Sequence, residues 1–565
     1  MAQPDPSPRW ARHVPIVGWL PQYQRSWLGA DLIAGFTVWG LLIPEMIAYA
    51  SLAGLPPQAG LYTLLASLAL YAIFGTSRQL IVAGTSASAV LVYAAVSDLS
   101  PHSTSDYATL AAAMIITAGV ILAVAGLLKL GFITEFLSRP VMTGFVFGLA
   151  IFVSVSQLPK LFAIEKGHGD TVQQLFHVVA NLDSTSLTTF ATGLLALAIL
   201  FGIERFAPRI PGGLVVLVLG ISLSAVFDLS SHGVAIVGDI TAGLPSPGFP
   251  SIALRDLWVL VPSALGMVLV IYSEALGAAK TFADQHGYRV DSNQEMIALG
   301  LANIGSGLFG GLAAGGSLSQ SAVNDGAGAR TELSPLVAAG LSLITVVALT
   351  PLFHDLPEAV LAALIIHAVH HLMRVAQMRR YYRLDRWEFW LGISTLVGVV
   401  VFDVLPGLGI GVVLSLVLMI GRASRPKVSI LGRNLAQPGA YRDIDRDPHA
   451  HAIAGILIVR PDAQLFYANA QAVRDAIDAA AMAEPHPAVV IVDLDANDDL
   501  DITSAEHLTK LQSELAASGI QLCLAHVHDP AREMMHETGL LERVGAEHVF
   551  VNLDTAVKWA EQRPR

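Results

Sequence analysis

The sequence reads GTSASAV at residues 84–90 and GSLSQSAV at residues 316–323. Each stretch opens on glycine, is dense in small and hydroxyl side chains, and begins an apolar segment shorter than the roughly 20 residues of a full membrane span. Such segments at corresponding places of two halves indicate a binding site near the bilayer midplane, between inverted repeats. Small residues that only allow close helix packing are the alternative, and that alternative is stronger for one stretch alone than for a matched pair.

Apolar residues dominate the chain around these stretches. Of 565 residues, 54% are hydrophobic and 14% are charged, a balance that ordinary soluble proteins do not show. The pattern predicts an α-helical polytopic membrane protein with 14 spans, formed by two inverted repeats of seven. The expected spans are 31–49, 59–75, 85–97, 107–127, 138–158, 187–204, 211–229, 257–279, 294–311, 319–329, 334–353, 357–377, 387–403 and 406–422.

The C-terminal part is polar and predicts a second, soluble domain. Four short apolar runs that resemble strands alternate there with helical patterns, which is typical of a small α/β sheet. The runs cover 455–460, 488–495, 520–526 and 548–552. We therefore expect an N-terminal segment at 1–30, a transmembrane transport domain at 31–422, a linker at 423–449 and a cytoplasmic α/β domain at 450–565.

Charged residues predict the orientation of the chain and exclude some functions. Lys and Arg concentrate in every second loop, so both termini are expected in the cytoplasm of a multi-pass inner-membrane protein. The net charge of −12 without basic clusters argues against nucleic-acid binding. The single cysteine, Cys523, excludes a disulfide within the chain.

The two short segments predict an anion site. A helix that begins in mid-membrane has unpaired N–H groups and a partial positive charge at its start, so two such ends facing each other can bind a small oxyanion without a fixed cation. Aromatic side chains are expected to shape the pocket. The predicted substrate-binding residues are Thr85, Ser86, Ala87, Ser319, Gln320, Ser321, Tyr49 and Phe145.

Two carboxylates lie inside predicted spans. Glu45 follows Pro44 in the first span, and Glu274 occupies the eighth, which is its counterpart in the second half. Burying an ionisable group in a membrane costs free energy, so each carboxylate is a candidate for function. Both are predicted to bind and release a proton during the transport cycle. A structural carboxyl group hydrogen-bonded to a neighbouring helix is the alternative for each.

Other chemistry has little support in the sequence. His367, His370 and His371 have spacing compatible with a metal site, but they approach a basic cytoplasmic loop and are expected to lack a nearby carboxylate ligand set, so we expect no metal. Neither a nucleotide-binding loop nor a catalytic triad signature occurs, so the chain is expected to be no enzyme and to need no cofactor beyond the proton as coupling ion.

Several motifs together resemble one family. They are DLIAGFTV at 31–38, Pro44 to Tyr49, LAGLPPQAGLY at 52–62, SRQ at 77–79, RPV at 139–141, NQE at 293–295, SAVN at 321–324 and GART at 328–331. With them the chain resembles the sulfate permease (SulP) family of anion transporters over nearly its whole length. The resemblance implies a core and a gate domain, elevator-like movement of the core, a homodimer, and a C-terminal STAS domain.

The resemblance also bears on single residues. Family members with a glutamate at the position of Glu45 look like proton-coupled symporters, whereas Gln320 stands where the family often has an arginine. Ala278 replaces a hydroxyl residue of relatives with a sodium site, which favours protons over sodium. Thr503 matches a phosphorylation site of related STAS proteins; a helix cap is the alternative role of this threonine.

We therefore predict secondary active transport of an inorganic anion, most of all sulfate, by proton symport. Bicarbonate and a C4-dicarboxylate such as fumarate remain open as substrates. An anion channel, or a sensor that signals through the STAS domain, is the alternative from another class. The expected partners are the anion, membrane lipid, a second copy of the chain and a cytoplasmic regulator of the STAS domain.

Overall fold

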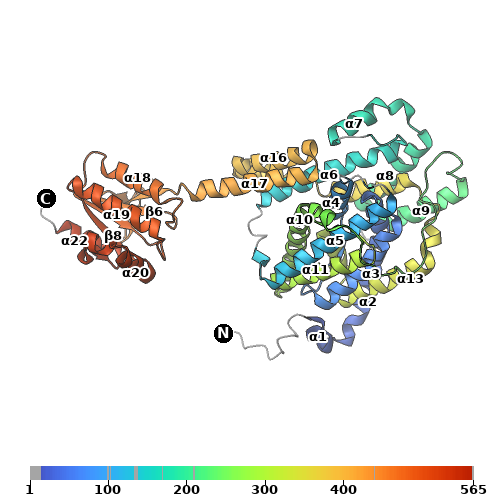
Figure 1. Cartoon of the computed structure of the whole chain (residues 1–565), viewed down its shortest axis with the longest axis horizontal. Helices are drawn as coiled ribbons and strands as arrows, with labels where there is room; N and C mark the ends of the chain where they lie inside the picture. The colour runs from blue at the N-terminus through green and yellow to red at the C-terminus, as the bar shows by residue number, and fades with distance from the viewer. Residues whose placement is uncertain are drawn as a thin grey trace. The chain divides into compact units, whose positions relative to one another are not determined.

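The computed structural model describes residues 14–562 except 98, 100, 102, 133–137, 168–169, 208–209 and 438. Residues 1–13 of the expected N-terminal segment and the last three residues of the chain lie outside this description. The chain forms two compact units, Met1–Ser415 and Leu416–Arg565 (Figure 1). The described N-terminal residues form short helical turns, namely α1 (Ile16–Trp19), η2 (Leu20–Gln22) and η3 (Arg25–Trp27).

The first unit is helical, and the order of its elements repeats. Two helices, a short strand with a short helix, and a further helix occur in this order twice. The first set is α2 (Leu28–Leu52), α3 (Pro57–Phe74), β1 (Val82–Gly84), α4 (Ser86–Ser97) and α5 (Thr104–Leu127). The second set is α10 (Leu254–His286), α11 (Ser292–Leu308), β2 (Ala314–Gly316), α12 (Leu318–Gly326) and α13 (Leu333–Ile344).

The remaining helices of this unit follow each set. After the first come α6 (Arg139–Phe162), α7 (Thr171–Ala180), η5 (Leu182–Ser184), α8 (Leu187–Phe206) and α9 (Gly212–Phe227). After the second come η6 (Thr345–Leu349), η7 (Thr350–Phe353), α14 (Glu358–His370), α15 (Val375–Leu384), α16 (Arg386–Phe402) and α17 (Val404–Ala423), of which the residues after Ser415 belong to the second unit.

Every segment expected to span the membrane contains a helix. Within the described residues, nine helices are long and apolar enough to cross a membrane by length and composition, and α4 and α9 are shorter apolar helices. The helical membrane fold is therefore confirmed, while the number of 14 spans stays a prediction.

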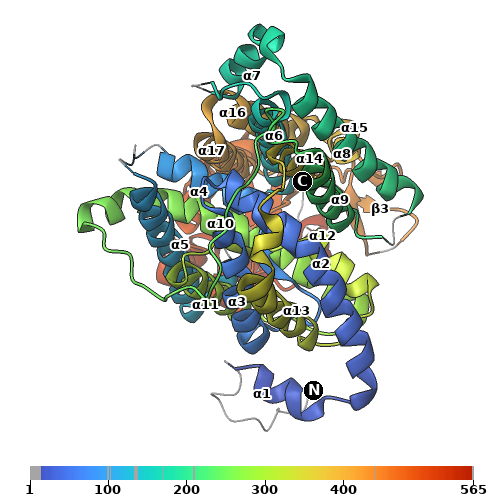
Figure 2. The ribbon, with the colours of Figure 1, turned by 90° about the vertical axis from the view of Figure 1, so that its right-hand side faces the viewer.

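The helices of the first unit pack in two groups (Figure 2). In one group, α11 lies against α3 and α5, and α13 lies against α2 and α3. In the other, α6 lies against α14 and α16, and α8 lies against α9 and α14. Small residues allow the closest contacts: a Cβ on Gly119 of α5 would lie 2.7 Å from the carbonyl oxygen of Gly300 in α11. Close backbone approach at small residues is the usual way in which membrane helices pack.

Strands β1 and β2 join the two sets of helices. They pair antiparallel, with Val82 opposite Gly316 and Gly84 opposite Ala314. Both strands are completely buried. Because the strands are antiparallel, α4 starts at one end of this three-residue pair and α12 starts at the other, so the two helix starts are separated by only the length of the pair. Each short helix therefore follows an extended strand that ends on glycine.

The second unit is an α/β sheet with the strand order β4-β3-β6-β7-β8-β9, and β5 pairs with β3. Strands β6 to β9 run parallel to one another, whereas β3 is antiparallel to β4, β5 and β6. The strands are β3 (Val428–Asn434), β4 (Tyr441–Asp443), β5 (Ala450–His451), β6 (Ile456–Pro461), β7 (Val489–Asp493), β8 (Gln521–Ala525) and β9 (Val549–Phe550). The helices are α18 (Ala470–Ala481), α19 (Ile502–Ala517), α20 (Asp529–Glu537), α21 (Leu540–Val544), the short η8 (Ala546–His548) and α22 (Leu553–Glu561).

The sheet has an apolar core on each face. One core contains residues of α18, α19, α20 and α21, and the other contains residues of α22. The four strands expected from the sequence are present, but the segment expected to be a linker, 423–449, contains β3 and β4. Its strands are short or alternate with polar residues, and for this reason the apolar pattern did not identify them.

Candidate functional site

The starts of α4 and α12 lie at the two ends of the β1–β2 pair. Thr85 precedes α4, and its Oγ1 accepts a hydrogen bond from Ser88 N at 3.1 Å, while Ser88 Oγ accepts one from Thr85 N at 3.1 Å. Ser317 precedes α12, and its Oγ accepts a hydrogen bond from Gln320 N at 3.4 Å. These caps leave the other first-turn N–H groups, including those of Ser86 and Ala87, without an acceptor inside their helix. Both helix starts therefore attract negative charge.

The carboxylate of Glu45 on α2 contacts the start of α12. Gln320 Nε2 donates to Glu45 Oε2 at 2.8 Å and to the carbonyl oxygen of Gly84 at 3.3 Å. Gln320 is only 2% exposed, and its Oε1 has no hydrogen-bond partner among the described residues. One buried amide therefore joins the carboxylate, the end of β1 and the first turn of α12.

Tyr49 belongs to the same region as the two predicted carboxylates. It follows Glu45 by one helical turn, is 5% exposed, and lies within electrostatic range of both Glu45 and Glu274. Glu274 on α10 has no hydrogen-bond partner in the described part of the chain. It does lie within electrostatic range of the Arg374 guanidinium. Both carboxylates thus belong to one polar region around Tyr49.

Glycine allows α10 to approach this region. A Cβ on Gly316, at the end of β2, would lie 2.7 Å from Ala275 Cβ and 2.8 Å from Ala275 Cα. Both distances are below any normal carbon contact, so only glycine fits here without a shift of backbone. The strand therefore lies directly against the helix that carries Glu274.

The structure places the other predicted residues differently. Ser321 is fully buried, and its Oγ accepts a hydrogen bond from Ile81 N at 2.9 Å, which ties α12 to the residue before β1. Ser319 is exposed and shares a hydrogen bond with Ser317 at 2.9 Å. Phe145 is fully buried on α6, and within the described residues no hydrogen bond or ring contact joins it to the other predicted residues. Substrate binding by these three residues stays a prediction.

One residue that supports the site was not singled out as a site residue from the sequence. Asn303 of α11 accepts a hydrogen bond from Ala314 N at 2.9 Å and donates one to Ala314 O at 2.8 Å. A single side chain therefore satisfies both polar groups of one residue in β2. Its place in an apolar helix is the available signal, because a buried amide needs partners.

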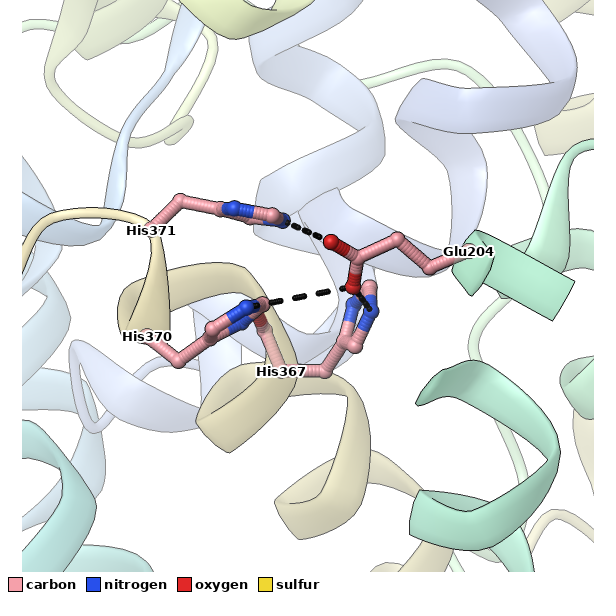
Figure 3. A group of neighbouring side chains, drawn as sticks. All are labelled: Glu204, His367, His370 and His371. Atoms are coloured by element: carbon pink, nitrogen blue, oxygen red, sulfur yellow. Dashed lines mark hydrogen bonds and ion pairs between the residues drawn. The ribbon is translucent and has the colours of Figure 1, made fainter. Parts of the chain in front are cut away.

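The prediction about the three histidines needs correction. The three histidines His367, His370 and His371 do have a carboxylate beside them, because Glu204 near the end of α8 reaches all three (Figure 3). The expectation that no carboxylate lies near them is therefore wrong. Glu204 is more than 160 residues away in the sequence, and only the packing of α8 against α14 brings it there.

The start of α19 in the second unit decides whether Thr503 caps this helix. Asp501 caps this helix, since its Oδ1 accepts a hydrogen bond from Ser504 N at 2.7 Å and its Oδ2 accepts one from Tyr467 N at 2.7 Å. Thr503 lies inside the first turn and is partly exposed. A capping role of Thr503 is therefore wrong, and its phosphorylation stays a prediction.

A cavity of about 300 Å³ lies elsewhere in the first unit. Lys160, Lys166 and Glu358 are among its lining residues, and Lys160 forms an ion pair with Glu358 at 3.1 Å. None of the predicted substrate-binding residues lines this cavity. It is therefore separate from the region around Gln320.

Comparison with known families assigns both parts of the chain. The description "Sulfate permease family" matches residues 28–395, and "STAS domain" matches residues 447–556. The probable sulfate transporter MT1781 of Mycobacterium tuberculosis is 35% identical over 555 residues, which cover 97% of this chain and 99% of that protein. Sulfate transporter 4.1, chloroplastic, of Arabidopsis thaliana is 30% identical, with 96% and 82% of the two chains covered.

Solved structures share the fold. The inward-facing structure of the murine anion transporter Slc26a9 covers all of this chain, and 96% of that chain is matched, with a TM-score of 0.90 and 24% identity. The transmembrane domain of the cyanobacterial bicarbonate transporter BicA covers 69% of this chain and is itself 98% matched, with a TM-score of 0.60 and 24% identity. At these identities the structures support the fold alone.

Proposed function

Because the chain belongs to the sulfate permease family, which consists of transporters and not enzymes, we propose that it carries an inorganic anion across the membrane together with a proton. Sulfate is the proposed substrate, because the curated relatives named above are described as sulfate transporters. The anion would bind between the starts of α4 and α12, where first-turn N–H groups and hydroxyls supply donors.

The hydrogen bond between Gln320 and Glu45 is the observation that carries the proton coupling. It places a carboxylate 2.8 Å from an amide in the first turn of α12. While Glu45 is ionised, its negative charge repels an anion and holds the Gln320 N–H group. Once Glu45 is protonated, the repulsion disappears and the amide is free to donate to the anion. Anion and proton would therefore bind together, which is the requirement for symport.

The absence of a fixed cation at the site, among the described residues, counts against a doubly charged anion, and a proton on Glu45 offsets part of that deficit. No arginine stands in the first turn of α12, because Gln320 occupies the position where relatives often carry one. A doubly charged anion would then face only partial positive charges, and the proton on Glu45 would remove one competing negative charge. Glu274, near Tyr49, is the second carboxyl group that could exchange a proton during the cycle.

The wider setting follows from the fold. We assign the chain to the inner membrane with both termini in the cytoplasm, as a homodimer in contact with lipid. The group of helices containing α3, α5 and α11 would move with the anion against the group containing α6, α8 and α14, in the manner of an elevator. The STAS domain would receive a cytoplasmic regulator, and Thr503 would accept a phosphate.

Uptake into proteoliposomes tests the proposal. Labelled sulfate, bicarbonate and fumarate are offered to separate samples, with an inward proton gradient, with an inward sodium gradient, and with a protonophore. We expect sulfate to accumulate only with the proton gradient and to be lost when the protonophore is added. Accumulation of bicarbonate or fumarate alone would reassign the substrate, and accumulation driven by sodium would reassign the coupling ion. Equilibration without any gradient dependence would indicate a channel, and background uptake of all three anions would favour a sensor.

A further inference from the structure

Four side chains with metal-binding atoms converge where α8 meets the end of α14 (Figure 3). Glu204 comes from α8, His367 and His370 from the last turn of α14, and His371 from the residue that caps this helix. One oxygen or nitrogen of each side chain lies within 4.8 Å of the corresponding atoms of the other three. We propose that these residues bind one divalent transition-metal ion of the zinc class.

The distances are compatible with a four-ligand site. Glu204 Oε2 lies 2.9 Å from His367 Nε2 and 3.8 Å from His370 Nε2, and Glu204 Oε1 lies 3.7 Å from His371 Nε2. In a tetrahedral zinc site with ligands at about 2.0–2.2 Å, neighbouring ligand atoms are about 3.3–3.6 Å apart. The three imidazole nitrogens lie at 2.9–3.8 Å from one or the other oxygen of Glu204, which is close to the spacing that a shared ion requires.

The imidazole of His370 is held in the required orientation. Its Nδ1 lies 2.5 Å from the carbonyl oxygen of His367. A carbonyl oxygen only accepts hydrogen bonds, so Nδ1 must carry the proton, and Nε2 remains as the atom with a free lone pair. A second hydrogen bond of this kind fixes the tautomer of metal-binding histidines in many proteins.

Aromatic contacts restrict two of the rings further. Phe201, one turn before Glu204 on α8, makes edge contacts with His367 and His370, with ring centroids 5.1 and 4.9 Å away. The rings of His370 and His371 are themselves only 3.8 Å apart. Packing therefore limits the rotamers and keeps the nitrogen atoms near the carboxylate.

Hydrogen bonds alone explain this cluster of four side chains less well than a bound ion does. One carboxylate faces three imidazoles, and only the distance to His367 is short enough for a hydrogen bond. Protonation of His370 and His371 together would place two positive charges on adjacent rings. A single divalent ion satisfies all three neutral nitrogens and the carboxylate at once, and it also suits the negative end of the α14 dipole.

The ligand types select the class of ion. Imidazole nitrogen with one carboxylate suits zinc and its neighbours in the first transition series, whereas magnesium and calcium prefer oxygen ligands. The four side chains are partly exposed, so an ion can reach them from water. The exposed cations Arg205 and Arg374 lie near in the sequence but offer no ligand atoms. A bound ion would cross-link α8 to α14 within one group of helices.

The test uses the full-length protein in detergent, purified on a tag without histidine and treated with a chelator. Because the chain has 18 histidines, the informative result is saturable binding rather than binding as such. We expect titration with Zn²⁺ to saturate at one ion per chain, Co²⁺ to give the visible absorption of a four-coordinate site, and Zn²⁺ to raise the unfolding temperature.

Variants locate the ion. Glu204→Gln and His370→Ala should weaken Zn²⁺ binding by at least about tenfold, since loss of even a supporting group costs 10- to 100-fold in metal affinity. His354→Ala is the matched control, because His354 lies 2.8 Å from Asp239 in another histidine–carboxylate pair of the first unit, and it should bind Zn²⁺ as the wild type does. Unfolding without metal shows whether each variant is folded. Absence of saturable binding by the wild type, or equal binding by Glu204→Gln, His370→Ala and the control, would overturn the proposal.

Discussion

The two units treat their carboxylates in different ways. In the first unit, neutral donors hold buried carboxylates: Asp31 accepts hydrogen bonds from two backbone N–H groups and two hydroxyls, and Glu295 accepts from Tyr71 and Thr76. In the second unit, several carboxylates form ion pairs with partly exposed Lys or Arg side chains. These pairs are Lys427–Asp443, Lys558–Asp554 and Arg433–Glu561.

The difference reflects the two environments. Inside a membrane protein, a hydrogen bond to a buried charge is poorly replaced by solvent, so its loss is expensive. At a protein surface, water and salt screen an ion pair, and its net contribution is small. Changes to the buried carboxylates of the first unit should therefore have large effects, and changes to the ion pairs of the second unit should have small ones.

The largest effect is expected at Glu45. Glu45→Gln removes the only group bonded to Gln320 Nε2 that can exchange a proton, so accumulation of sulfate driven by a proton gradient should fall to background. Glu45→Asp keeps an exchangeable carboxyl group and should retain part of the activity. Labelled uptake with and without the gradient measures both. If Glu45→Gln still accumulates the anion in a gradient-dependent way while Glu274→Gln does not, the proton is carried by the other half of the molecule.

The next largest effect is expected for Asp31, as a loss of stability. Asp31→Ala leaves Arg330 N, Thr331 N and Thr331 Oγ1 without their acceptor, and each buried donor left unpaired costs about 1–3 kcal/mol. Asp31→Asn keeps one acceptor oxygen and should lose less. Thermal unfolding in detergent measures these changes. Asp106→Ala, at an exposed position in the first turn of α5, should change stability by no more than about 0.5 kcal/mol, and an equal loss at both sites would remove the contrast between buried and exposed carboxylates.

Gln320 should show an intermediate effect on transport. Gln320→Ala removes the N–H group that donates to the anion in the proposed cycle, and a hydrogen bond to a charged group is worth about 1.5–3 kcal/mol or about 10- to 150-fold in an equilibrium constant. Uptake should slow by about tenfold or more, yet it should still depend on the proton gradient, because Glu45 remains. Gln377→Ala is the control, since Gln377 donates only to the hydroxyl of Tyr381, and its uptake rate should match that of the wild type. Unchanged uptake in Gln320→Ala would separate this amide from the substrate cycle.

The sequence predicted the region of the site better than its contacts. Glycine and hydroxyl residues at 84–90 and 316–323 identified the two helix starts, because these residue types are unusual in an apolar segment. The contact of Gln320 with Glu45 joins residues 275 positions apart, and no local pattern contains that information. The same holds for Glu204 beside the histidines, and for β3, whose place in the sheet depends on pairing with β6. Residue types within one segment could therefore be interpreted from the sequence. Contacts between residues of distant elements could be identified only from the structure.

The smallest effect is expected at the Lys427–Asp443 pair of the second unit. The pKa shift of Asp443 predicts how the stabilisation by this pair changes with pH. The hydrogen bond from Lys427 lowers the pKa of Asp443 to about 2, from an ordinary value of 3.8. Because the folded pKa is the lower one, the pair contributes its full stabilisation above about pH 4 and loses it as the pH falls toward 2. Asp443→Asn should therefore lower the unfolding temperature slightly at pH 7 and much less at pH 2.

A soluble fragment of residues 424–565 allows this measurement, since it keeps β3 and β4, which a fragment beginning at residue 447 would lose. High salt should reduce the difference at pH 7, because ions screen an exposed pair. Asp445→Asn, at an exposed neighbouring position, is the control without an ion pair and should show no such pH dependence. A large destabilisation by Asp443→Asn that persists at pH 2 and in high salt would mean that packing, and not charge, acts at this position, and the contrast between the two units would then rest on burial alone.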